Sequence, residues 1–68
     1  MFEVTVARGQ ANALKQAIRK AAKGGCRIEE SDGDEAQVSY CVTEIDEDDM
    51  AAIELAASTI PTATYDWK

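Results

Sequence analysis

The spacing of the apolar residues switches between two periods along this chain, and that switching constrains the fold more than any other feature. Phe2, Val4 and Val6 alternate with polar or small residues, which is typical of a half-buried strand. From Gln10 the period becomes helical, and Gly24-Gly25 provides a stop. The expected inward face of this helix comprises Leu14, Ala17, Ile18, Ala21 and Ala22.

The rest of the chain predicts four further elements. Residues 26–31 and 37–43 are strand-like and flank Asp32-Gly33, which is a hairpin signal. A helix is expected from Asp46 to Ile60, ended by Pro61, and a last strand over 62–67. The residues expected to face inward are Cys26, Ile28, Val38, Tyr40, Val42, Met50, Ile53, Ala57, Ile60, Ala63, Tyr65 and Trp67.

The order of elements is therefore β-α-β-β-α-β within one small domain, residues 1–68. Right-handed crossovers and a central hairpin make this the split βαβ, or ferredoxin-like, α+β fold. Four antiparallel strands would carry both helices on one face. The other face would be open and polar, with Thr5, Glu29, Ser39, Cys41 and Thr64.

The hairpin register predicts the state of the two cysteines. Pairing Ile28 with Val38 and Cys26 with Tyr40 keeps all four in the core. Cys41 would then lie on the open face, unbonded to Cys26. A disulfide is the alternative, and it needs a one-residue slip that turns one strand's apolar side chains toward water.

The composition excludes several classes of function. The net charge of −6 argues against binding a nucleic-acid backbone or an anionic membrane. No apolar run approaches the ~20 residues of a membrane span, and the start does not resemble a signal peptide, so we expect a cytoplasmic protein. The chain lacks histidine and any catalytic motif. We therefore expect a non-enzymatic protein without cofactor.

The acids form two clusters at opposite ends of the strand over 37–43, which places them roughly 25–30 Å apart. The N-cap of the second helix and the helix dipole explain much of the first cluster. Turn chemistry and protection of an edge strand explain part of the second. The first cluster, the helix-start acids, comprises Glu44, Asp46, Glu47, Asp48 and Asp49; the second, the hairpin acids, comprises Glu29, Glu30, Asp32, Asp34 and Glu35.

The basic residues are concentrated in the first 27 positions, which hold six bases against one acid. The end of the first helix should bring Lys20, Lys23 and Arg27 near the helix-start acids. Arg8 is the only base expected near the hairpin acids, which are therefore the less compensated cluster. Both clusters are candidate partner-binding sites.

Other binding chemistries find less support. The run Asp46-x-Asp48 lacks the glycine and the distal glutamate of an EF-hand loop, so we expect no metal. Related folds that bind heavy metals need Cys-x-x-Cys after the first strand, where this chain has residues 7–12 without cysteine. RNA-recognition domains need aromatic residues on the open face, whereas Phe2 and Tyr40 are expected inward.

A small acidic chain with this element order, with the hairpin acids of residues 29–35 and the helix-start acids of residues 44–49, resembles the small phage-encoded anti-CRISPR proteins, in particular inhibitors of type I-C effector complexes. The resemblance implies a monomeric protein of the host bacterial cytoplasm. Such a protein binds the basic, DNA-recruiting surface of a Cas complex by mimicking DNA charge. The alternatives are a metabolite-binding regulatory domain that dimerises through its sheet, and an adaptor of toxin–antitoxin or housekeeping type.

Overall fold

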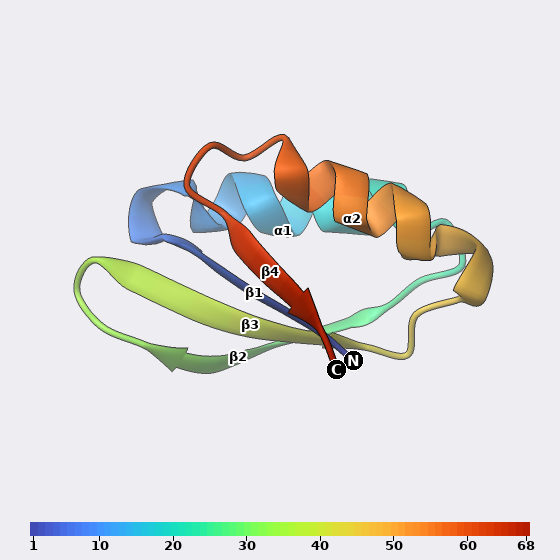
Figure 1. Cartoon of the computed structure of the whole chain (residues 1–68), viewed down its shortest axis with the longest axis horizontal. Coiled ribbons are helices and arrows are strands. Elements are labelled where there is room, and N and C mark those ends of the chain that lie inside the picture. The colour runs from blue at the N-terminus through green and yellow to red at the C-terminus, as the bar shows by residue number, and fades with distance from the viewer.

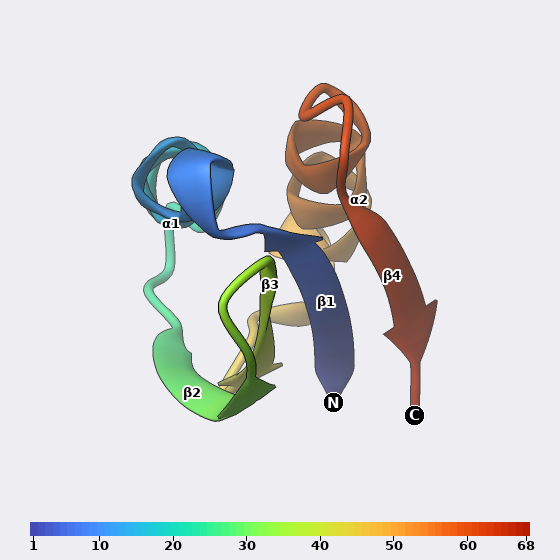
Figure 2. The ribbon, with the colours of Figure 1, turned by 90° about the vertical axis from the view of Figure 1, so that its left-hand side faces the viewer.

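The computed structural model describes residues 1–68, and its elements follow the predicted order. The sheet is antiparallel with strand order β2-β3-β1-β4, and both helices cover the same face (Figures 1 and 2). The predicted ferredoxin-like α+β fold is thus confirmed. The elements are β1 (Phe2–Ala7), the 3-10 turn η1 (Arg8–Gln10), α1 (Ala11–Ala21), β2 (Arg27–Gly33), β3 (Gln37–Thr43), the 3-10 turn η2 (Glu47–Asp49), α2 (Met50–Ser58) and β4 (Thr64–Trp67).

The core lies between the sheet and the two helices. Alternate residues of β1 and β3 point into it, as their period of two predicts, while Leu14 and Ile18 of α1 and Ile53 of α2 close it from above. Ala57 of α2 is fully buried, and its small side chain allows α2 to pack closely against the rest of the core. Neither α-helix is long and apolar enough to cross a membrane.

Aromatic contacts attach β4 to β1. Phe2 lies opposite Trp67, with ring centroids 4.5 Å apart, and its ring is 5.4 Å from that of Tyr65. Tyr65 was expected in the core, but it is 38% exposed because β4 is an edge strand. Its hydroxyl donates to Glu54 of α2, as does the indole N–H of Trp67.

The predicted hairpin register is wrong by four residues. Ile28 pairs with Val42, not with Val38, and the strands join at a turn over 34–37 instead of at Asp32-Gly33. The carboxylate of Asp34 builds that turn by accepting from the backbone N–H of Gln37, and Gly33 belongs to β2. A four-residue shift preserves which face each side chain occupies, so the fold is unaffected.

A β-bulge at Ser31 changes the register once more. Glu30 lies opposite Tyr40, whereas Asp32 lies opposite Ser39, so Ser31 is the extra residue. The bulge brings Asp32 to the open face of the sheet beside Ser39. Without it, Asp32 would share the helix-covered face with Glu30.

The second helix also departs from prediction at both ends. It starts as η2, and α2 ends at Ser58, two residues before Ile60. Ile60 is half-buried, and Met50, expected to face inward, is 40% exposed because it lies at the first turn, beyond the edge of the core.

The cysteines lie on opposite faces of the sheet, as expected. Both are free thiols. Cys26 packs against the core but is half-buried, not fully buried, because it precedes β2 and pairs with no strand residue. Cys41 lies on the open face opposite Glu3.

Candidate functional site

Two of the helix-start acids have structural roles. Asp49 is buried, and its carboxylate accepts from the backbone N–H of Gly24 at 2.8 Å. Asp46 is the N-cap of η2, as predicted, although its carboxylate accepts from the N–H of Asp48 and not of Asp49. A Cβ atom at Gly24 would lie 2.9 Å from an Asp46 carboxylate oxygen, so a larger residue there would require the Asp46 side chain to shift.

The other helix-start acids are exposed and have no basic partner. The Asp49–Gly24 bond confirms that α2 starts beside the end of α1. However, the chain's two ion pairs join Arg27 to Glu29 and Lys68 to Glu3, so none of the bases expected nearby, Lys20, Lys23 and Arg27, forms an ion pair with a helix-start acid. The carboxylates of Glu44, Glu47 and Asp48 therefore face solvent.

Among the hairpin acids, Asp34 belongs to the turn itself. Its carboxylate accepts from the N–H groups of Ala36 (2.8 Å) and Gln37 (2.9 Å). These bonds, first that from Gln37, lower the pKa of Asp34 below its ordinary value, with a smaller contribution from the positive charge of Arg8. Arg8 lies at this end, as predicted, but its guanidinium donates to the carbonyl of Asp34 at 2.8 Å and not to a carboxylate.

The corrected register spreads the hairpin acids along β2. Glu29 and Glu30 lie opposite Cys41 and Tyr40, well away from the turn. Glu29 pairs with Arg27, whereas the carboxylates of Glu30 and Glu35 have no hydrogen bond or ion pair within the chain. The prediction that all five acids gather at the hairpin end is therefore wrong for Glu29 and Glu30.

Together these residues make an acidic edge, defined as the hairpin acids Glu29, Glu30, Asp32, Asp34 and Glu35. Strand β2 is an outer strand of the sheet, and every one of its residues except the half-buried Ile28 is exposed. At ~3.4 Å per residue, the strand part of the acidic edge, residues 29–33, extends over roughly 14 Å, and Asp34 and Glu35 continue it into the turn. The acidic edge is thus a line of negative charge and not a compact patch.

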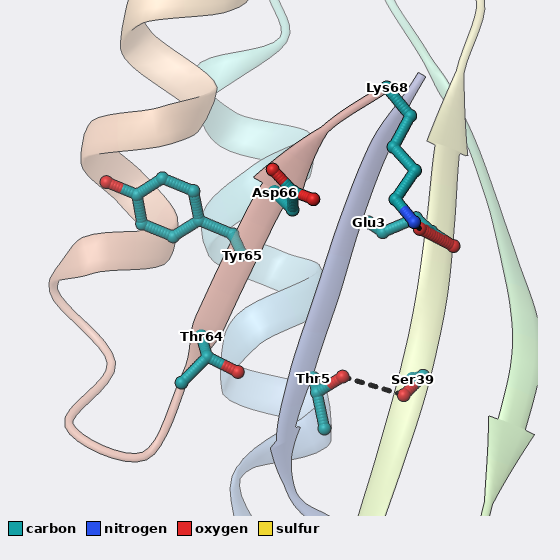
Figure 3. A pocket seen from close by; sticks show the side chains of 7 residues that line it. All are labelled: Glu3, Thr5, Ser39, Thr64, Tyr65, Asp66 and Lys68. Atoms are coloured by element: carbon teal, nitrogen blue, oxygen red, sulfur yellow. Dashed lines mark hydrogen bonds and ion pairs between the residues drawn. The ribbon is translucent and has the colours of Figure 1, made fainter.

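The open face contributes two acids that the sequence analysis did not select. Glu3 and Asp66 lie opposite each other on β1 and β4, beside a shallow hollow of about 230 Å³ (Figure 3). Lys68 pairs with Glu3 at 3.1 Å, and Asp66 has no partner. The Thr5 and Ser39 hydroxyls share a hydrogen bond of 2.7 Å across the same face. The strict alternation of β1 and β4 was the signal that places Glu3 and Asp66 there.

No protein family, no curated protein and no solved structure matches this chain. No group of three potential ligands among Cys, Asp and Glu is arranged to hold a metal ion. The chemistry that these surfaces offer is that of exposed carboxylates, which attract Lys and Arg side chains of a partner.

Proposed function

We propose that this protein is a non-enzymatic inhibitor that binds a basic, nucleic-acid-binding surface of a bacterial CRISPR–Cas effector complex and blocks its access to target DNA. The suggested target class is the type I-C complex. The protein would bind it as a monomer in the host cytoplasm. The observation that carries the proposal is the acidic edge, which follows the exposed outer strand β2 into the turn and in which the carboxylates of Glu30 and Glu35 have no partner within the chain.

The spacing of this charge supports mimicry of DNA. Each strand of duplex DNA carries one charge per ~3.4 Å of helix axis, and a β-strand advances by a similar ~3.4 Å per residue. Because successive side chains of β2 point to opposite faces of the sheet, a groove whose Lys and Arg side chains follow a DNA strand meets the carboxylates of either face at about half that density. Electrostatic attraction of this kind speeds association and selects for basic partners.

The nearby bases leave the acidic edge negative. Arg27 is used by Glu29, and Arg8 is held by the carbonyl of Asp34. Both bases are outnumbered by the five carboxylates. The exposed helix-start acids Glu44, Glu47 and Asp48 lie at the other end of β3 and extend the negative surface.

The test compares two double variants of equal net charge. Glu30→Gln with Glu35→Gln removes the two unpartnered charges of the acidic edge. Asn12→Lys with Gln16→Lys adds two charges on exposed positions of α1. Each variant changes the net charge from −6 to −4. Asp34 is left intact because its carboxylate builds the turn.

We expect the Glu30/Glu35 variant to bind a purified type I-C effector complex at least about tenfold more weakly, since a close interfacial charge pair contributes about 1.5 kcal/mol or more. The Asn12/Gln16 variant should bind like the wild type. Equal affinities of the wild type and both variants would reject the proposal.

The uncovered sheet face favours one other function, a regulatory domain that binds a metabolite and dimerises through its sheet. The hollow between Glu3 and Asp66 is the feature that would hold such a ligand. A sheet-to-sheet dimer would bring the like charges of these acids close to their copies, which is unfavourable. A concentration-dependent dimer in sedimentation, insensitive to the Glu30/Glu35 change, would favour this function instead.

A further inference from the structure

The two chain termini lie close together (Figure 1). An apolar hollow of about 460 Å³ lies there, lined by residues at the start of β1, the ends of β3 and β4 and the start of α2. We call it the terminal hollow. Its apolar lining comprises Met1, Val42, Ile45, Met50 and Trp67. Its volume is within the range of about 300–1,000 Å³ that is common for ligand sites in proteins.

The apolar lining is partly open to solvent. Met1 is 50% and Met50 is 40% exposed, although apolar side chains of this size are usually buried. Val42 is fully buried beneath them, and Trp67 is half-buried at the side. Methionine side chains are flexible and adapt to different apolar partners. These side chains offer an apolar surface against which one apolar group of a partner can pack.

The backbone at the rim is strained. Glu44 has a φ of 56°, and it is the one residue other than glycine with a positive φ. Such a conformation is unfavourable for a residue with a side chain, and it persists where the surrounding structure enforces it, often at functional sites. Glu44 connects the end of β3 to Ile45, and Glu44 and Ile45 both line the terminal hollow.

The unpaired charge around the terminal hollow is negative. Glu44 is exposed at its rim, and the exposed Glu47 and Asp48 precede Met50 in the chain without a basic partner. The positive groups at the rim are already engaged: Lys68 pairs with Glu3 at 3.1 Å, and the terminal amine of Met1 donates to the Lys68 carbonyl at 2.7 Å. The charge thus favours a partner with Lys or Arg beside its apolar group.

We infer that the terminal hollow is a second docking site, which receives one bulky apolar side chain of a partner protein flanked by Lys or Arg. The apolar side chain fills the space between Met50 and Trp67, and the flanking bases meet Glu44, Glu47 and Asp48. The inference rests on the proposed function only for the basic character of the partner. It adds an apolar anchor that a pure mimic of DNA charge does not need.

The probe is the peptide acetyl-Lys-Lys-Leu-Lys-Lys-amide, added to the isolated protein at low salt. Trp67 is the only tryptophan of the chain and lines the terminal hollow, so its fluorescence reports when the hollow is filled. The same titration followed by amide NMR should shift the signals of Val42, Ile45 and Met50. Two control peptides replace the leucine by alanine, or the four lysines by glutamates.

We expect the leucine peptide to bind roughly tenfold more tightly than the alanine peptide, since burying a leucine side chain contributes about 1.5 kcal/mol or more. The glutamate peptide should not bind. Met50→Gln should weaken binding of the leucine peptide, whereas Leu55→Gln should not, because Leu55 is an exposed residue of the same helix outside the terminal hollow. Circular dichroism verifies that both variants fold.

Equal binding of the leucine and alanine peptides, equal binding of the glutamate peptide, or no binding of the leucine peptide would each overturn the inference. The peptide assay does not need the effector complex, so these results would leave the proposal for the acidic edge standing. Peptide binding at the terminal hollow together with failure of the effector complex to bind the protein would reject the proposed function alone.

Discussion

The carboxylate of Asp49 accepts a hydrogen bond at 2.8 Å from the backbone N–H of Gly24. This contact joins the start of α2 to the segment that follows α1, although the two residues are 25 positions apart in sequence. Because Asp49 is only 7% exposed, water is largely excluded from the bond. One of the helix-start acids is thus part of the fold and not of a binding surface.

Replacing Asp49 by alanine should lower the free energy of unfolding by about 1–3 kcal/mol, because the N–H of Gly24 loses its partner. Asp48→Ala is the matched control, since its carboxylate is exposed and has no partner; its cost should stay below about 1 kcal/mol, from the helix dipole alone. Urea denaturation followed by circular dichroism measures both. Equal losses would contradict a structural role specific to Asp49.

The turn at Asp34 predicts a pH dependence of stability. Hydrogen bonds from Gln37 and Ala36 lower the pKa of Asp34 in the folded protein. A lowered pKa stabilises the fold at pH values above the ordinary aspartate pKa, and this stabilisation is lost as the pH falls through the lowered value. Urea midpoints measured from neutral to acidic pH should therefore fall less steeply for Asp34→Asn than for the wild type. Parallel curves would rule this out.

The contact with Glu54 should affect the pKa of Tyr65. The hydrogen bond from Tyr65 to Glu54, then burial, then the Glu54 charge raise the pKa of Tyr65 above its ordinary value. Glu54→Gln should lower the pKa of Tyr65 toward the ordinary range, as followed by NMR of the tyrosine rings. Glu47→Gln, on η2, should leave it unchanged. A raised pKa also means that Tyr65 loses its stabilising contribution as the pH rises through the alkaline range.

The thiols should titrate as two separate free groups. Unfolded protein that has not been reduced should give two thiols with a colorimetric reagent. Burial is the main reason that the pKa of Cys26 is raised, which lowers its thiolate fraction. In a Cys41→Ser variant, Cys26 should therefore react more slowly in the native protein than in urea. The absence of free thiols, or equal rates for Cys26, would contradict this placement.

The fold was predictable because side-chain alternation and helical periodicity report directly on burial. Phe2, Val4 and Val6 are buried as their alternation predicts, and Leu14 and Ile18 lie on the buried face of α1. These patterns depend on local spacing alone. They are therefore insensitive to the exact strand pairing.

The hairpin register was not predictable from the same patterns. A shift of four residues leaves every side chain on its face, so burial cannot distinguish Ile28–Val38 from Ile28–Val42 pairing. The choice depends on contacts between distant segments. One such contact joins Arg8 to Gly33, since a Cβ atom on Gly33 would lie 2.7 Å from the guanidinium of Arg8. The turn is closed by the carboxylate of Asp34 and not by Asp32-Gly33.

The candidate sites were predictable as acidic residues but not as an arrangement. Charge alone does not distinguish the buried Asp49 from the exposed Asp48, since both follow the same N-cap. Likewise, the predicted register placed Glu29 and Glu30 near the hairpin end, whereas the structure places them in the middle of β2. The terminal hollow had no sequence signal, because it forms from both termini and the residues around Ile45.

The most direct test of the central proposal is competition between this protein and target DNA for a purified type I-C effector complex. Fluorescence anisotropy of labelled protein, measured over a range of salt concentrations, reports both competition and affinity. We predict that duplex target DNA displaces the protein from the complex. The affinity of the protein for the complex should fall steeply as the salt concentration rises. Simultaneous binding of both molecules, or an affinity independent of salt, would contradict mimicry of DNA charge by the acidic edge.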